Sequence, residues 1–105
     1  MRLSKPHLNG YDNLPLLVQV LPEQKLFETE VDGRTAFVQY RLLNGSLDII
    51  HTIVPRPIEG QGIAAALVKA AYDYAMANGL KPKATCTYAI AWLKRHPEVL
   101  EGAEK

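Results

Sequence analysis

Hydrophobic and polar residues alternate through the middle of the chain, which is the pattern of half-buried β-strands. In Phe27–Val31 charged residues occupy every second position, and Asp32-Gly33 follows as a pair typical of a two-residue hairpin turn. Thr35–Leu43 alternates in the same way and leads into a second turn pair, Asn44-Gly45. The next run, Leu47–Val54, is rich in Ile and Val. These three runs predict an antiparallel meander.

A helical period replaces this alternation in the second half of the chain. Apolar residues recur every three or four positions over Gly62–Asn78, and the following Gly79 is a typical helix stop. Lys83–Thr87 is predicted to form a short strand, and Tyr88–Arg95 a second helix. A strand, a helix and a strand of this length imply a right-handed crossover, with the last strand parallel to the strand before the helix. The predicted fold class is therefore α+β: a meander, a β-α-β crossover and a C-terminal helix.

The first 24 residues contain three prolines and show no sustained period. We expect an irregular N-terminal extension there, in which only Leu16–Val20 forms an edge strand. With 105 residues the chain is long enough for one domain with a modest core, so a single domain over residues 1–105 is expected.

Composition narrows the range of partners. Hydrophobic residues make up 48% and charged residues 22%, which is ordinary for a soluble globular protein. A formal net charge of +1 provides no basic field for nucleic acid, and no apolar stretch approaches the roughly 18 residues of a membrane span. We therefore expect a cytoplasmic protein that binds neither nucleic acid nor membrane. A single cysteine and the absence of His and carboxylate spacing typical of a metal centre leave no metal site to expect.

The string Gly60-Gln61-Gly62-Ile63-Ala64-Ala65 is the first candidate site. It places a glycine pair where a helix normally begins with a polar cap, so the first backbone N–H groups of the helix lack side-chain partners. Such N–H groups, together with the positive end of the helix dipole, favour an anion such as phosphate. The alternative is an ordinary glycine-rich loop that enters a helix. The string is neither a P-loop nor a Rossmann fingerprint, because the residues that complete those motifs are missing.

Cys86 is the second candidate. It closes the strand that is predicted after the helix, just before the second helix begins. In open α/β units ligands gather beyond the carboxyl ends of parallel strands, and a helix start lowers the pKa of a thiol. Cys86 is therefore either a reactive thiol or an inert packing residue, since free cysteines are among the most often buried residues.

Two histidines have more than one interpretation. His51 lies in the third strand, on the same face as Leu47, Ile49 and Ile53, and is either a general base or a core histidine with satisfied hydrogen bonds. His96 follows the second helix, where capping is expected.

Four aromatic residues at helix positions are expected to fill the core rather than to form a binding surface. They are Tyr72, Tyr74, Tyr88 and Trp92.

Five motifs occur together in order: His51-Thr52-Ile53-Val54-Pro55, Glu59-Gly60-Gln61-Gly62-Ile63-Ala64, Gly79-Leu80-Lys81, Cys86-Thr87-Tyr88 and Arg95-His96-Pro97-Glu98. In this order and at these separations, the chain resembles the small GNAT-related acetyltransferase-like family over roughly Phe27 to Glu98. The resemblance implies a trimmed GNAT fold, in which acyl-CoA lies between two splayed parallel strands.

The resemblance also implies roles for single residues. The N–H groups of Gly60, Gln61, Gly62, Ile63, Ala64 and Ala65 would hold the pyrophosphate of CoA, and the backbone of Ile53 and Val54 would pair with the pantetheine arm. The thioester would lie near Cys86, which in related small members is a proposed acyl-accepting nucleophile, with His51 as a proton acceptor. In the usual GNAT route the amine attacks acetyl-CoA directly, and Cys86 would then only line the cleft.

Acetyl-CoA is thus the expected cofactor and an unidentified amine the expected acceptor. Two functions of other classes remain open at this point. One is a non-catalytic CoA-binding or regulatory module, and the other is a protein-interaction domain that uses an open strand edge.

Overall fold

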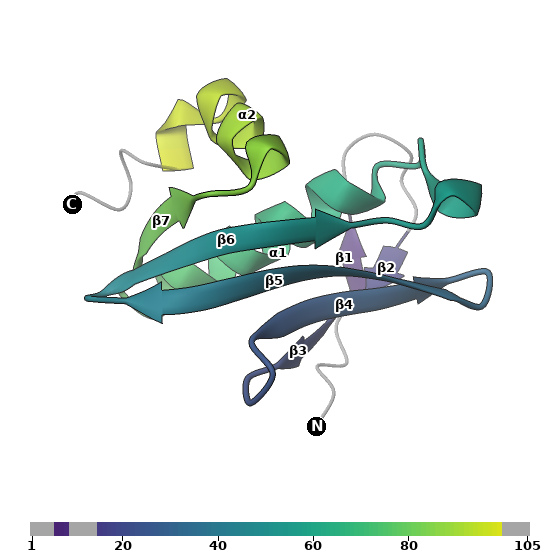
Figure 1. Ribbon diagram of the computed structural model, residues 1–105, viewed down its shortest axis with the longest axis horizontal. Coiled ribbons are helices and arrows are strands. Elements are labelled where there is room, and N and C mark those ends of the chain that lie inside the picture. The colour runs from purple at the N-terminus through teal and green to yellow at the C-terminus, as the bar shows by residue number, and fades with distance from the viewer. Residues whose placement is uncertain (1–5, 9–14, 100–105) are drawn as a thin grey trace.

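The computed structural model of the chain describes residues 6–8 and 15–99. Its elements follow in chain order: β1 (Pro6–Leu8), β2 (Pro15–Leu17), β3 (Gln19–Leu21), β4 (Leu26–Val31), β5 (Arg34–Leu43), β6 (Ser46–Ile53), a 3-10 turn (Arg56–Ile58), α1 (Ile63–Ala77), β7 (Lys81–Ala84) and α2 (Thr87–Arg95) (Figure 1). The predicted α+β class, with a meander before a β-α-β unit and a C-terminal helix, is confirmed.

The main sheet has the strand order β3-β4-β5-β6-β7. Its neighbours are antiparallel except β6 and β7, which pair in parallel as the crossover predicts. Both predicted hairpin turns form, with positive φ at Asp32 and Gly33 and again at Asn44 and Gly45. Positive φ at both central residues is the geometry that matches the right-handed twist of the flanking strands.

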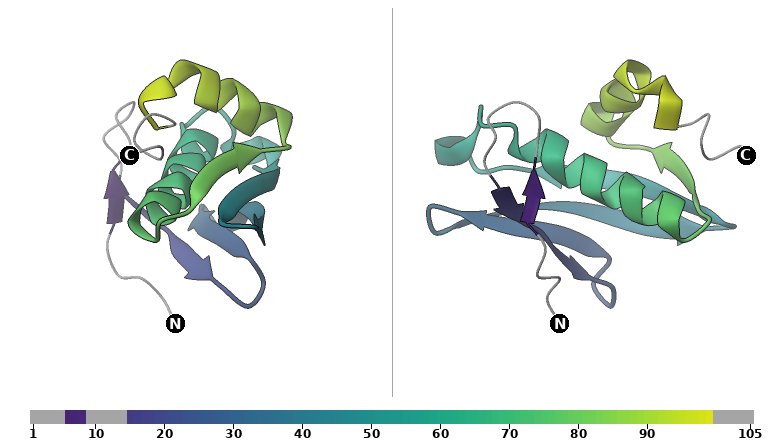
Figure 2. Two further views of the ribbon diagram at one scale, coloured as in Figure 1. Left: turned by 90° about the vertical axis from the view of Figure 1, so that its left-hand side faces the viewer. Right: turned by 180° about the vertical axis from the view of Figure 1, so that it is seen from behind.

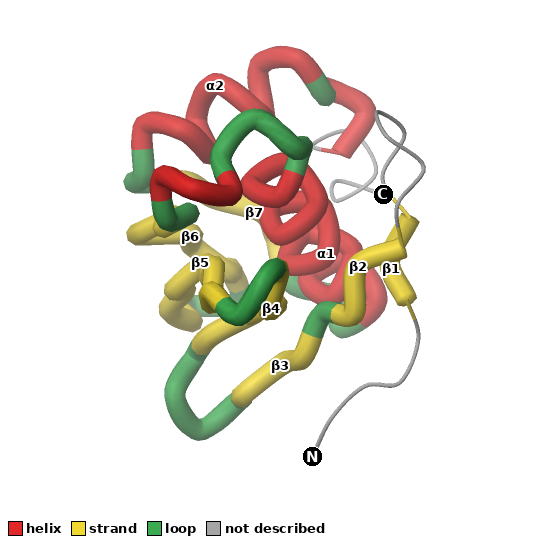
Figure 3. Tube along the Cα trace, turned by 90° about the vertical axis from the view of Figure 1, so that its right-hand side faces the viewer, coloured by secondary structure: helices red, strands yellow, loops and turns green. Residues whose placement is uncertain are grey.

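Helix α1 lies along one face of the sheet, and α2 lies beside β7 (Figures 1 and 2). The end-on view shows α1 against the sheet with the small β1-β2 ribbon on its other side, whereas α2 lies above α1 and next to β6 and β7 (Figure 3). The core forms where α1 meets β4, β5 and β6. Three rings join within it: the ring centroid of Phe27 lies 5.3 Å from that of Tyr40 and 5.4 Å from that of Tyr74. On the opposite face of β4–β6 no helix is found within the described residues.

A β-bulge interrupts β6 and changes which face its side chains occupy. Tyr40 pairs with Ile49 whereas its neighbour Gln39 pairs with His51, so Ile50 is the extra residue. Cross-strand partners share a face, and adjacent residues of β5 point to opposite faces. His51 therefore lies on the helix-free face, and Thr52, which pairs with the buried Val38, lies on the α1 face.

The structure differs from the sequence prediction near both ends of the chain. The predicted edge strand Leu16–Val20 is divided at Val18 between β2 and β3, and β1 is a further short strand within the first 24 residues. Residues 1–5 and 9–14 of that predicted extension lie outside the described residues. The strand predicted over Lys83–Thr87 instead runs from Lys81 to Ala84, and it contains Pro82. Lys81 and Thr85 donate their N–H groups to Gly45 and Ile49, so the alternation turns Pro82, which has no N–H group, away from β6.

Candidate functional site

The parallel strands β6 and β7 part midway along β6. They pair only from Ser46 to Ile49, after which the N–H groups of Thr85 and Cys86 both donate to the carbonyl of Ile49. Beyond this shared acceptor β6 continues to Ile53 without a strand beside it on that side, within the described residues. The separation leaves an open strand edge that leads to the start of α1.

The loop between β6 and α1 ends in left-handed backbone. Gly60 has φ of 82° and Gly62, the N-cap residue of α1, has φ of 80°, a region that residues with a Cβ rarely adopt. A Cβ on Gly60 would meet no other atom within 4 Å, so the space beside it is open. Glycine is needed here for its backbone geometry.

No side chain in the described part of the chain caps the N-terminus of α1. Gly62 makes no side-chain cap hydrogen bond, the first turn contains no acidic residue, and the first helical bond runs from the Ala66 N–H to the Gly62 carbonyl. Within the described residues, the N–H groups of Ile63, Ala64 and Ala65 thus have no acceptor. This end of the helix is suited to hold an anion.

A cavity of about 470 Å³ joins the strand edge to the helix start. Its lining comes from three segments that are far apart in the chain: Thr52, Ile53 and Val54 from β6 and the residue after it, Glu59, Gly60, Gly62, Ile63, Ala64 and Ala65 from the loop and α1, and Tyr88 from α2. Of the eight residues that the sequence predicts for CoA, all except Gln61 line this cavity. We call it the cleft.

Gln61 lines a second hollow, which the same loop borders. This hollow also has a volume of about 470 Å³ and shares Gly60, Gly62, Ala65 and Tyr88 with the cleft. It adds Gln61, Trp92 and Arg95. The loop therefore contributes to the walls of two hollows, and the wall of the second one includes an arginine.

Cys86 stands at the corner between β7 and α2, as the N-cap residue of α2. Its side chain is half-buried, and its sulfur lies 3.4 Å from the hydroxyl oxygen of Thr52. Thr52 lines the cleft and Cys86 does not, so the thiol lies beside the cleft, behind Thr52. The predicted position after a parallel strand and before a helix is confirmed.

The pKa of Cys86 is lowered from its ordinary value. Burial raises it, but hydrogen bonds that favour the thiolate outweigh this effect: from the Thr52 side chain, from the backbone of Ala89 and Tyr88, and from the backbone of Thr52. The backbone donors of Tyr88 and Ala89 belong to the first turn of α2, of which Cys86 is the N-cap residue. The thiol is more nucleophilic near neutral pH than an ordinary cysteine.

The interpretation of His51 as a core residue is wrong. The bulge at Ile50 turns His51 to the face opposite Leu47 and Ile49, where its side chain is exposed. Only Ile53 shares its face, as the register with β5 shows. His51 does not line the cleft.

His96 caps α2 as predicted. Its ring Nδ1–H donates to the Trp92 carbonyl over 2.9 Å, and the ring stacks on Trp92 at 4.0 Å. Tyr72 and Trp92 are buried as expected, but Tyr88 is half-buried and its ring borders both hollows. Sequence reasoning missed Tyr88 and Arg95 as site residues because helical spacing alone does not show which face of α2 borders the loop.

The chain also resembles proteins of known family. A sequence model described as GCN5-related N-acetyl-transferase matches residues 26–102. Protein NATD1 of Mus musculus is 30% identical over 86 residues, which cover 79% of this chain and 78% of the mouse protein. Protein NATD1 of Xenopus tropicalis is 40% identical over 52 residues, which cover 50% of this chain and 48% of that protein, so this match spans about half its length.

A solved structure supports the same relationship. The solution structure of a GCN5-like protein from Staphylococcus aureus matches with a TM-score of 0.60 and 31% identity, over 71% of this chain and 76% of that one. The chain belongs to the GCN5-related N-acetyltransferase family, and its fold is the trimmed form of that family's domain. Enzymes of this family generally use acetyl-CoA.

Within the part of the chain that the structure describes, no helix is long and apolar enough to cross a membrane. In residues 6–8 and 15–99 no three His, Cys, Asp or Glu side chains gather as a metal ion would require.

Proposed function

We propose that this protein is an acetyl-CoA-dependent N-acyltransferase that transfers an acetyl group to an amine. The observation that supports it most is the cleft, because one cavity collects an unpaired helix N-terminus, an open strand edge and the neighbourhood of a thiol. These features suit, in that order, the diphosphate, the amide-bearing arm and the thioester of acetyl-CoA.

The diphosphate would be held by backbone N–H groups at residues 60–65. Positive φ at Gly60 and Gly62 leaves these groups uncovered, and no side chain of the described residues caps the start of α1. Arg95 lies in the wall of the second hollow and adds positive charge, whereas Glu59 in the cleft opposes it. The pantetheine arm would pair with β6 at Ile53 and Val54, as an added strand.

Acetyl-CoA, when bound, supplies an activated thioester with a good leaving group. In the covalent route, the thiolate of Cys86 would attack the thioester carbonyl carbon and break its bond to the CoA sulfur, which would depart as a thiolate and take up a proton. The amine then attacks the acetyl carbon on Cys86, loses a proton and returns Cys86 to the thiolate. The lowered pKa of Cys86 supports this route.

In the direct route the amine attacks the thioester itself and Cys86 only contacts Thr52. His51 would serve either route as a proton acceptor. It lies on the helix-free face, from which an amine can approach the edge of β6 without displacing a helix of the described chain.

Mass spectrometry after incubation with acetyl-CoA tests the proposal. We expect one acetyl adduct on the wild type and none on Cys86→Ala, together with consumption of acetyl-CoA when a panel of amines is added. Acetyl transfer by Cys86→Ala at the wild-type rate would refute the covalent route and leave the direct one. Absence of transfer by either protein to any amine would refute the enzyme.

A non-catalytic CoA-binding or regulatory module is the second candidate. It is favoured by one observation, the lack of any helix over the face of β4–β6 on which an acceptor pocket would be built, within the described residues. CoA and acetyl-CoA would then both raise the melting temperature, while no amine consumes acetyl-CoA.

A further inference from the structure

The buried carboxylate of Asp48 has no part in the function proposed so far. By register Asp48 shares a face with Arg41, on the side of the sheet that no described helix covers, and yet only 5% of its side chain is exposed. A buried carboxylate is costly unless charge and hydrogen bonds compensate it. The contacts of Asp48 must therefore compensate the cost of its burial.

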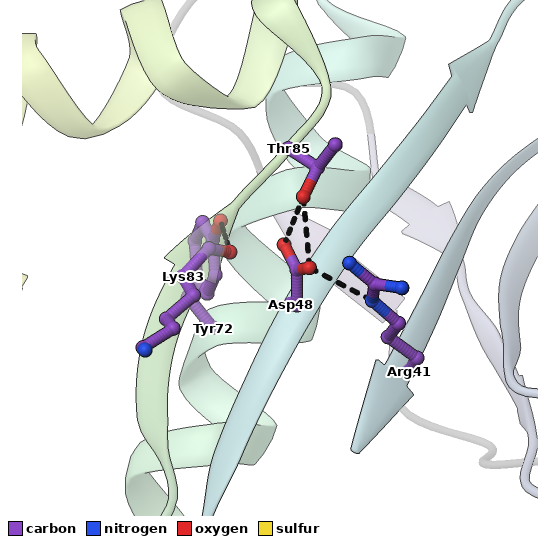
Figure 4. A network of polar contacts seen from close by, with 5 residues as sticks. All are labelled: Arg41, Asp48, Tyr72, Lys83 and Thr85. Atoms are coloured by element: carbon purple, nitrogen blue, oxygen red, sulfur yellow. Dashed lines mark hydrogen bonds and ion pairs between the residues drawn. The ribbon is translucent and has the colours of Figure 1, made fainter. Parts of the chain in front are cut away.

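Those contacts join three strands (Figure 4). Oδ2 of Asp48 accepts from Nε of Arg41 on β5 at 3.0 Å. The hydroxyl of Thr85, just beyond β7, lies 2.8 Å from Oδ2 and 3.1 Å from Oδ1. Close by, the hydroxyl of Tyr72 donates to the Lys83 carbonyl over 2.5 Å and holds β7 against α1. Asp48 thus ties the end of β7 to β6 and β5.

Thr85 and Cys86 together contact three residues of β6 on either side of the bulge. The side chain of Thr85 reaches Asp48 on the helix-free face, and the side chain of Cys86 reaches Thr52 on the α1 face. Between them both N–H groups share the carbonyl of Ile49. The corner between β7 and α2 is therefore held to β6 by two side-chain contacts in addition to the two backbone hydrogen bonds.

We propose that Asp48 is a positioning residue, which through Thr85 sets the β7–α2 corner against β6 and thereby holds Cys86 against Thr52 beside the cleft. Asp48 touches neither the cleft nor the thiol, and it acts through its neighbours. The structural role of Asp48 is independent of the proposed function. Only the further statement that the position of Cys86 matters for acetyl transfer rests on that function.

The test measures how readily the thiol of Cys86 reacts, rather than the overall stability of the protein. The rate of alkylation of the thiol by iodoacetamide is followed against pH for the wild type, Asp48→Asn, Thr85→Val and Thr85→Ser, all at temperatures well below melting. When Thr85 no longer anchors the corner, the thiolate of Cys86 loses the hydroxyl of Thr52 as a hydrogen-bond donor. The pH midpoint of alkylation should then rise by about half a unit, which slows the reaction at neutral pH about threefold.

Thr85→Ser keeps the hydroxyl and should restore the wild-type profile. Asp73→Asn is the matched control, since it breaks an ion pair with Lys69 of 2.8 Å on the exposed side of α1, and it should leave the profile unchanged. Thr85 is exposed, so Thr85→Val leaves no buried cavity and should fold. This variant therefore tests the inference even if Asp48→Asn does not fold. A folded Thr85→Val with the wild-type profile would overturn the inference.

Alkylation of Cys86 needs no CoA, so its outcome is independent of the experiments that test the proposed function. If CoA does not bind, the proposed function fails whatever the alkylation profiles show. If CoA binds and the profiles do not move, only the role of Asp48 fails. If both hold, Thr85→Val should bind CoA within twofold of the wild type and transfer acetyl more slowly through the covalent route.

Discussion

The sulfur of Cys86 lies 3.4 Å from the hydroxyl oxygen of Thr52, a residue 34 positions earlier in the chain. The contact exists because the bulge at Ile50 turns Thr52 toward α1, and because β7 ends where Cys86 can begin α2. A sequence pattern on either segment alone would not show it.

Replacing Thr52 with valine should raise the pKa of Cys86. Valine keeps the shape but removes a hydroxyl donor that favours the thiolate, so a larger part of the thiol stays protonated at neutral pH. We expect alkylation at pH 7 to slow about threefold to tenfold, as a rise of half a unit to one unit implies. Thr87→Val, which removes a hydroxyl without a hydrogen bond in the described chain, is the control; equal rates in the two variants would contradict the account.

Gly60→Ala should weaken CoA binding, and Gly33→Ala should not. Both glycines have positive φ, 82° and 75°, and in both a Cβ meets no other atom within 4 Å. Each variant should therefore lose a similar free energy of unfolding, on the order of 1–2 kcal/mol. Only the Cβ of Gly60 would project beside the proposed diphosphate. Calorimetric titration with CoA should show a loss of affinity in Gly60→Ala alone, and a parallel loss in Gly33→Ala would contradict the site.

Charges around the loop should tune the affinity for CoA in opposite directions. Arg95→Gln removes a positive group from the wall of the second hollow, and Glu59→Gln removes a negative one from the cleft. Both side chains are exposed, so each effect is modest: about 0.2–1 kcal/mol, which is up to about fivefold in Kd. Titrations at low and high salt should show weaker binding for Arg95→Gln, tighter binding for Glu59→Gln, and convergence as salt rises. The same direction for both would count against a diphosphate there.

Tyr72 should make the fold sensitive to alkaline pH. Burial, then the charges of Asp48 and Cys86, raise its pKa well above the ordinary value, so the unfolded chain ionises more readily. The stability that this provides is complete below about pH 10 and is lost as pH rises above it. Tyr72→Phe should flatten that decline in urea unfolding measurements, and at neutral pH it should cost about 1–2 kcal/mol because the Lys83 carbonyl loses its donor. An unchanged alkaline slope would contradict this.

The elements that local chemistry determines could be predicted from the sequence. Asp32-Gly33 and Asn44-Gly45 adopt the positive φ values that their turns require, and the period of α1 is continuous between two glycines. The strand after α1 begins at Lys81 rather than at the predicted Lys83, and it accommodates Pro82 because the position of the missing N–H group faces away from β6.

The parts of the site that depend on register between distant segments could not be predicted. The face of His51 was wrong because nothing in Leu47–Val54 marks Ile50 as a bulge; it arises from pairing with β5. Tyr88 and Arg95 border the loop only because α2 packs through Trp92 on Tyr72 of α1, with ring centroids 5.7 Å apart. The role of Asp48 could not be predicted, because the sequence does not show that this acidic residue of a strand is buried.

A titration of the labelled protein with CoA, followed through backbone amide chemical shifts, tests the central proposal most directly. The account predicts that the largest shifts fall on Gly60–Ala65, where free N–H groups would meet the diphosphate, and on Ile53 and Val54 along the open edge of β6. Amide shifts that are absent at millimolar CoA, or scattered away from these two segments, would contradict it.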